Sequence, residues 1–184
     1  MKKFILDTSV FVNPKAREGF GGSVDDAIEN FIKLAKKKKG MEFYMPPSVF
    51  SELSHFSTKT EKLSEYVKKR APNIYATYLP AAVFYAFIDD VRRRVNKGLR
   101  IAEQFAIDNR PDNDVKLRAL REKYREAMRA GIVDSKEDFE LILLARELDG
   151  TVVTSDEGII ALANSLGCEY LEGEKFEKLL KKKG

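Results

Sequence analysis

Five acidic residues occupy places in this sequence from which their carboxylates could act together. They are Asp7, Glu52, Asp134, Asp138 and Asp156. Asp7 directly follows the apolar residues 4–6, and continuous hydrophobicity of this kind is typical of a parallel strand buried on both faces. Ligands bind at the carboxyl ends of the strands in open α/β sheets, so an acid at this point is placed for chemistry. The alternative for Asp7 is that it caps the turn that follows.

The other acids have comparable positions. Glu52 lies in the helix expected after the second apolar segment, and Asp156 follows a later one. Asp134 and Asp138 are four residues apart at a helix start, so on a helix they share one face, roughly 40° apart around its axis. Because the carboxyl ends of parallel strands share one edge, we expect these acids to meet in one crevice. Capping of a helix is the alternative for Asp138 and Asp156.

The composition restricts the chemistry that such a crevice can perform. His55 is the only histidine and Cys168 the only cysteine, which excludes disulfides, Cys/His zinc sites and paired-histidine mechanisms. Clustered carboxylates repel one another and take up protons unless a cation is bound, and oxygen ligands favour Mg²⁺ or Mn²⁺. One or two such ions over a phosphodiester convert water into a nucleophile and stabilise the leaving oxygen. The sequence therefore predicts a metal site that can cut a phosphodiester.

Strands and helices alternate along most of the chain. Strands are expected at 4–6, 42–45, 151–154 and 168–171, and helices at 23–35, from 48 onward, and at 60–70, 135–148, 159–166 and 176–180. Residues 13–22 are expected to form a polar loop. This alternation predicts an α/β fold with a central parallel sheet flanked by helices.

Residues 80–131 interrupt the alternation. A long helix is expected from residue 80, and a second helix should follow the turn cluster at 108–113. The first helix carries a narrow apolar seam at alternating four- and three-residue steps, formed by Phe84, Ile88, Val91, Val95, Ala102 and Phe105. Such a hairpin buries little surface alone, so we expect it to pack on something else, most economically a second copy of itself.

The net positive charge of the chain is concentrated in this hairpin. Residues 87–131 hold twelve Lys/Arg and eight Asp/Glu, while the remainder of the chain holds twenty-one of each. Much of the charge comes from Arg92, Arg93, Arg94, Arg100, Arg118, Arg121, Arg125 and Arg129. We expect these arginines to bind RNA. The alternative is a solvated helix face whose arginines pair with nearby acids.

Length and composition set the organisation of the protein. The 184 residues suit one domain with one insertion, with residues 1–79 and 132–184 in the domain and 80–131 in the hairpin. No stretch approaches the roughly 20 apolar residues of a membrane span, and no signal peptide is evident. We expect a cytoplasmic protein without membrane partners.

The sequence resembles a known family at several of these motifs. The segments FILDTS at 4–9 and VTSDEG at 153–158, with Glu52, Asp134 and Asp138 between them, are similar to PIN-domain nucleases. The stretches VFVNP at 10–14, 84–100 and VDSKEDFEL at 133–141 resemble more narrowly the HARP group of protein-only ribonuclease P, whose members are also called RNA ligase partner proteins.

This resemblance implies a PIN-like three-layer fold and a metal-dependent endonuclease that removes the 5′ leader of precursor tRNA, leaving a 5′-phosphate. It implies that Asp7, Asp134, Asp138 and Asp156 hold Mg²⁺, for which Mn²⁺ can substitute, with Glu52 and Glu157 as supporting acids. It also implies a hairpin that dimerises and contacts tRNA, dimers that assemble further into a dodecamer, and no need for an RNA or protein subunit.

Two other functions are compatible with the same sequence. A PIN-type toxin ribonuclease would share the acids, although compact toxins usually lack a long basic hairpin. A non-catalytic RNA-binding partner of an RNA ligase would use the basic surface without cleavage. The site of cleavage in a precursor tRNA separates these functions.

Overall fold

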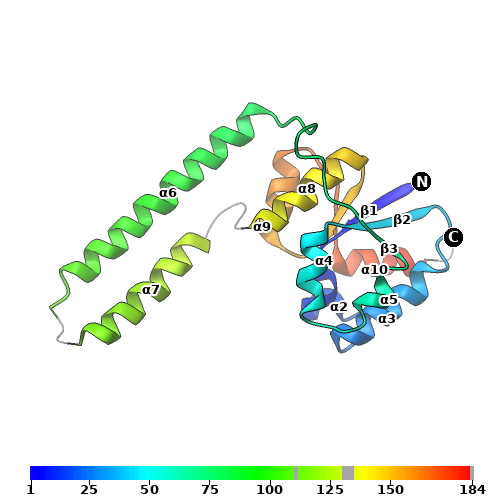
Figure 1. Ribbon diagram of the computed structural model, residues 1–184, viewed down its shortest axis with the longest axis horizontal. Coiled ribbons are helices and arrows are strands. Elements are labelled where there is room, and N and C mark those ends of the chain that lie inside the picture. The colour runs from blue at the N-terminus through cyan, green and yellow to red at the C-terminus, as the bar shows by residue number, and fades with distance from the viewer. Residues whose placement is uncertain (110–111, 130–134, 183–184) are drawn as a thin grey trace. The chain divides into compact units, whose positions relative to one another are not determined.

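The computed structural model describes residues 1–109, 112–129 and 135–182. It divides the chain into two compact units, drawn in Figure 1. One unit comprises Met1–Tyr78 and Ser135–Gly184, and the other comprises Leu79–Asp134. Among the described residues, no helix has both the length and the apolar character needed to cross a membrane.

The first unit is built on a five-stranded parallel sheet of order β3-β2-β1-β4-β5. Its strands are β1 Lys2–Leu6, β2 Met41–Met45, β3 Val67–Lys69, β4 Thr151–Thr154 and β5 Tyr170–Glu172. The central strand β1 pairs Ile5 with Tyr44 on one side and Leu6 with Val153 on the other. The predicted α/β fold with a central parallel sheet is thereby confirmed, and every strand ends at the same edge.

Helices cover both faces of this sheet (Figure 1). They are α1 Ser9–Val12, α2 Pro14–Arg17, α3 Val24–Ala35, α4 Pro47–Ser54, α5 Thr60–Leu63, α8 Lys136–Leu148, α9 Glu157–Ser165 and α10 Gly173–Lys181. On one face, Phe31 of α3 and Phe176 of α10 pack on the sheet, with ring centroids 5.1 Å from Phe43 and 5.4 Å from Phe4 respectively. On the other face, the Lys3 ammonium donates to the Leu148 carbonyl at the end of α8.

Two local predictions were wrong. The helix expected at 60–70 ends at Leu63, and the chain then forms the edge strand β3. The strand forms because Val67, which is buried, pairs with Phe43 of β2, and such long-range pairing overrides local helical periodicity. The polar loop expected at 13–22 contains the single-turn helix α2, which Asn13 caps by accepting from the Lys15 N–H.

The second unit is a pair of packed helices, α6 Ala81–Ala106 and α7 Asn113–Arg129. Their closest approach is at Gly98, where an added Cβ would lie only 2.7 Å from the Tyr124 ring and 3.0 Å from the Met128 side chain. Arg94 pairs with the buried Asp90 at 2.6 Å and donates to the Met128 carbonyl at 2.9 Å. The Gly98 contact and the hydrogen bond from Arg94 to the Met128 carbonyl therefore join the two helices, and Asp90 holds Arg94 from within α6.

Gly98 lies in line with the apolar seam of α6, seven residues after Val91, but the seam residues that precede it are exposed. Phe84, Ile88, Val91 and Val95 are each at least 40% exposed, so α7 does not cover them. Single exposed apolar residues need no explanation, but a continuous row of them marks a surface suited to a partner.

Candidate active site

Asp7 is the most enclosed of the predicted site residues. It follows β1, its N–H donates to the Val153 carbonyl at 3.0 Å, and only 5% of its surface is exposed. Its Oδ2 accepts hydrogen bonds from the Ser9 hydroxyl and, at 2.7 Å, from the Thr154 hydroxyl. Thr154 is fully buried at the end of β4. The carboxylate is therefore fixed at the carboxyl edge of the sheet, between the two central strands.

Burial raises the pKa of Asp7 above its usual value. The hydrogen bonds from Ser9 and Thr154 lower this pKa, while the negative charge of Asp156 raises it further. The net direction is upward, because the hydroxyls of Ser9 and Thr154 and the N–H of Thr8 do not replace full hydration, and no cationic side chain of the described residues contributes. A divalent cation beside Asp7 would supply the missing positive charge.

Glu52 is brought to Asp7 through Thr8. The Thr8 hydroxyl oxygen lies 3.3 Å from Asp7 Oδ1 and 3.2 Å from Glu52 Oε2. One hydroxyl carries one proton, so the two carboxylates share a single donor. Glu52 reaches this point because Pro46 follows the end of β2 and Pro47 begins α4, which places the second turn of α4 over the same edge.

Asp156 is the N-cap of α9, as its alternative interpretation predicted. Its Oδ1 accepts from the Gly158 N–H at 2.7 Å and the Ile159 N–H at 3.1 Å. Its own N–H donates to the Thr154 hydroxyl at 3.0 Å, which in turn donates to Asp7. Capping uses Oδ1, and within the described part of the chain Oδ2 accepts no hydrogen bond, so the cap leaves this oxygen available. Glu157 is exposed in the first turn of α9.

The helix α8 carries the remaining pair of acids. Asp138 is half-buried, and its N–H donates to the hydroxyl of the N-cap Ser135 at 3.1 Å, as the capping-box spacing predicted. Asp134 lies outside the described residues. In 1–109, 112–129 and 135–182, no three acidic, histidine or cysteine side chains form a group that would hold a metal ion. The structure thus brings together Asp7, Glu52 and Asp156.

The hydroxyl residues around Asp7 were not assigned a role from the sequence. Ser9 also accepts from the Ser155 N–H at 2.9 Å, so it joins the ends of β1 and β4. The role of Thr154 could have been inferred, because it ends the predicted strand 151–154 and pairing of Leu6 with Val153 makes it the neighbour of Asp7. The sharing of Thr8 with Glu52 carries no sequence signal, because it depends on how α4 packs.

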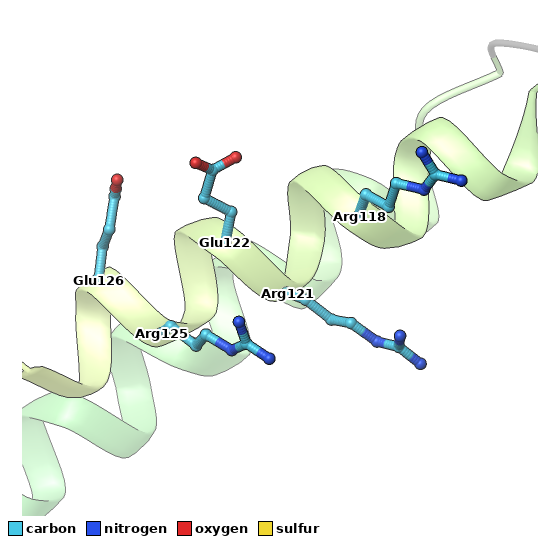
Figure 2. Close-up of a pocket in the computed structure, with 5 residues that line it drawn as sticks. All are labelled: Arg118, Arg121, Glu122, Arg125 and Glu126. Atoms are coloured by element: carbon cyan, nitrogen blue, oxygen red, sulfur yellow. The ribbon is translucent and has the colours of Figure 1, made fainter. Parts of the chain in front are cut away.

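The predicted RNA-binding arginines differ in what they contact. Those on α7 line a hollow on the helix surface, together with two glutamates; the lining residues are Arg118, Arg121, Arg125, Glu122 and Glu126. Figure 2 shows Glu122 and Glu126 on one side of α7 and Arg121 on the opposite side, while Arg118 and Arg125 extend along the helix. On α6, Arg92 and Arg100 are exposed and Arg93 lies 3.4 Å from Asp90, whereas Arg94 is engaged inside the hairpin. The side chain of Arg129 lies outside the described residues.

Replacement of Asp7 by Asn should stabilise the metal-free protein. A raised pKa means that the acid favours folding below its unfolded value of about 4 and that this contribution is lost as pH rises through the folded value. Asp7→Asn removes the buried charge and keeps the shape, so its free energy of unfolding in EDTA should exceed that of wild type by about 0.5–2 kcal/mol at pH 7.

The difference should shrink toward pH 4, and denaturant unfolding measures it. Asp89→Asn, at an exposed position of α6, is the control and should change neither quantity. Equal stability of wild type and Asp7→Asn across this pH range would contradict the account of Asp7.

Comparisons with known proteins identify the family of the chain. The sequence matches the family described as PINc domain ribonuclease over residues 3–183. It is 45% identical to RNA-free ribonuclease P of Thermococcus onnurineus, covering 97% of this chain and 93% of that protein. It is 44% identical to the protein of that name from Thermodesulfovibrio yellowstonii, over 97% and 93%, and 38% identical to that from Alkalilimnicola ehrlichii, over 100% and 98%. The chain therefore belongs to the PINc-domain ribonucleases and, within them, to the family of RNA-free ribonuclease P.

Proposed function

We propose that this protein is an endoribonuclease that removes the 5′ leader of precursor tRNA without an RNA subunit. The observation that carries the proposal is Asp7, buried at the carboxyl edge of the sheet and linked to Glu52 and Asp156 by hydroxyl groups. Family membership supports the substrate, since the relatives are named RNA-free ribonuclease P. Such an enzyme acts in the cytoplasm, where precursor tRNA is processed.

The donor set suits Mg²⁺, with Mn²⁺ as a substitute. Asp7, Asp138 and Asp156, with Asp134, would hold the ion, and Glu52 and Glu157 would support them. The fit rests on the chemistry of Asp7: its burial and the neighbouring charge of Asp156 both disfavour the carboxylate in the absence of a cation. When bound, Mg²⁺ would lower the pKa of a water molecule and stabilise the oxygen that leaves phosphorus.

The residues around the acids have positioning roles in this proposal. Ser9 and Thr154 hold Asp7 Oδ2 and thereby fix the orientation of the carboxylate. Thr8 keeps Asp7 Oδ1 and Glu52 Oε2 beside one hydroxyl. Hydrolysis on the leader side of the phosphate leaves the phosphate on the mature 5′ end and a hydroxyl on the leader.

The hairpin is proposed to bind tRNA and a second copy. Arg118, Arg121 and Arg125 of α7 line one hollow (Figure 2), and within the described residues none of them pairs with a carboxylate, which leaves them available for phosphates. The uncovered seam of α6, defined by Phe84, Ile88, Val91 and Val95, supports a homodimer, and dimers would assemble further into a dodecamer.

Asp156→Asn should lower the rate of precursor tRNA cleavage about a hundredfold or more, while the affinity for precursor tRNA should stay within about twofold of wild type. The amide keeps the cap through its oxygen but removes a charge beside Asp7. Cleavage by the purified protein with Mg²⁺ and with EDTA measures this effect. Asp149→Asn is the matched control, because Asp149 has a φ of 50° that asparagine also tolerates. Wild-type turnover of Asp156→Asn at saturating Mg²⁺ would remove Asp156 from the site.

Substitution of Val91 and Val95 by Asp should reduce the size of the assembly. Both side chains lie in the exposed seam, and burial of unpaired charge in an apolar interface is strongly unfavourable. Light scattering should report a smaller species, while the thermal unfolding of the sheet unit stays unchanged. Asp89→Asn serves as a control on the same helix. A double variant of native size would show that the seam is not the interface.

Replacement of Arg118, Arg121 and Arg125 by Ala should weaken binding of all precursor tRNAs alike. Loss of three phosphate contacts should make the slope of log affinity against log salt shallower by roughly 2 to 3. Titration at several salt concentrations measures this slope. Glu122→Gln with Glu126→Gln retains the arginines and should not make the slope shallower. An unchanged slope in the arginine variant would exclude this face of α7 from phosphate binding.

A further inference from the structure

β3 and the segment that follows it combine basic residues with exposed tyrosines, a composition that the fold of the sheet unit does not explain. Residues 67–78 contain Lys68, Lys69 and Arg70 and no acidic residue. They also contain two of the most exposed tyrosines in the described structure: Tyr75 is 94% exposed and Tyr78 is 88% exposed. Tyrosine side chains bury large areas when they contribute to folding, so these two contribute little to the fold.

This exposure occurs on an ordered turn. Glu147 of α8 accepts from the Asn73 N–H at 2.7 Å and pairs with Arg70. The Asn73 N–H and the Arg70 guanidinium lower the pKa of Glu147, so its carboxylate is charged at neutral pH. Asn73 Oδ1 accepts from the N–H groups of Tyr75 and Ala76, both at 3.2 Å. The backbone that carries Tyr75 is therefore fixed while its ring projects into solvent.

The turn begins at the catalytic edge of the sheet. β3 is parallel to β1, Lys69 is in register with Met45, and the Arg70 N–H donates to the Met45 carbonyl at 3.1 Å. The end of β3 thus lies two strands from the end of β1, about 10 Å at the usual strand spacing. Figure 1 shows the chain passing from β3 into this segment. A nucleic-acid strand cut beside Asp7 passes over β3 if it continues along that edge.

The charges beside the turn favour a nucleic acid. Lys68 pairs with Glu42, and Arg70 pairs with Glu147. The Lys69 ammonium lies 4.7 Å from the centre of the Phe50 ring and, within the described residues, pairs with no carboxylate. A cation without a carboxylate partner and two exposed tyrosines thus belong to one short segment, and proteins bind single strands with such side chains, phosphate on the cation and bases on the rings.

We propose that Tyr75 and Tyr78 bind the single-stranded 5′ leader of the precursor by stacking on its bases, with Lys69 contacting the leader backbone. This inference rests on the proposed function. Because stacking is tolerant of sequence, the subsite accepts leaders of any sequence and responds to their length. Glu147 is a positioning residue of this subsite, acting through Arg70 and Asn73.

The test compares the affinity of the full-length protein for mature tRNA and for precursors with a single-nucleotide or a much longer leader, in EDTA to prevent cleavage. Wild type should bind the long-leader precursor about tenfold more tightly than mature tRNA. Tyr75→Ala with Tyr78→Ala should remove this preference and leave affinity for mature tRNA and the single-nucleotide precursor unchanged. Tyr75→Phe with Tyr78→Phe keeps both aromatic faces and should retain the preference.

The proposal would be overturned if wild type showed no preference for the long leader. It would also be overturned if the alanine variant lost affinity equally for all three RNAs, or if it kept the leader preference. A smaller assembly by light scattering, or a lower melting temperature, in the alanine variant would assign the tyrosines to a protein contact instead and would also overturn it. Failure of the proposed function can be distinguished from failure of this proposal. In that case wild type would cleave no precursor with Mg²⁺, whatever leader preference its binding in EDTA showed.

Discussion

The site depends on the enclosure of one carboxylate. Asp7 is held by the hydroxyls of Ser9 and Thr154 in a position where its pKa is raised by burial, and Thr154 also receives the N–H of Asp156. The central strands must pair in the observed register for these contacts to form, since Leu6 opposite Val153 places Asp7 beside Thr154. The sheet therefore buries Asp7, which disfavours its charged form, and positions the hydroxyls that stabilise that form.

The apolar face of α6 is divided along its length between a contact with α7 and an exposed stretch. Gly98 and the hydrogen bond from Arg94 to the Met128 carbonyl join α6 to α7, while the seam residues before them, Phe84, Ile88 and Val91, stay uncovered. Because these contacts between the helices involve a small residue and a hydrogen bond, the exposed apolar side chains remain available to another surface.

The sequence predicted best where the pattern was local. Apolar residues 4–6 and the acid after them gave the central strand and Asp7, and the Ser135 cap lies where its spacing placed it. It failed at 60–70, because β3 forms only through pairing of Val67 with Phe43. The bond between Thr8 and Glu52 joins residues 44 positions apart, so no local pattern encodes it. Arg94 was grouped with exposed arginines because sequence periodicity does not reveal its contact with the Met128 carbonyl.

The most direct test of the account is the mapped 5′ end of precursor tRNA after incubation with the purified protein. With Mg²⁺, a single cut should release the leader intact and leave a 5′-phosphate at the first nucleotide of the mature tRNA, and EDTA should prevent the cut. Cleavage in the anticodon loop or scattered through the RNA would contradict it, as would tight binding without cleavage. The former would indicate a toxin-like ribonuclease, and the latter a non-catalytic RNA-binding protein.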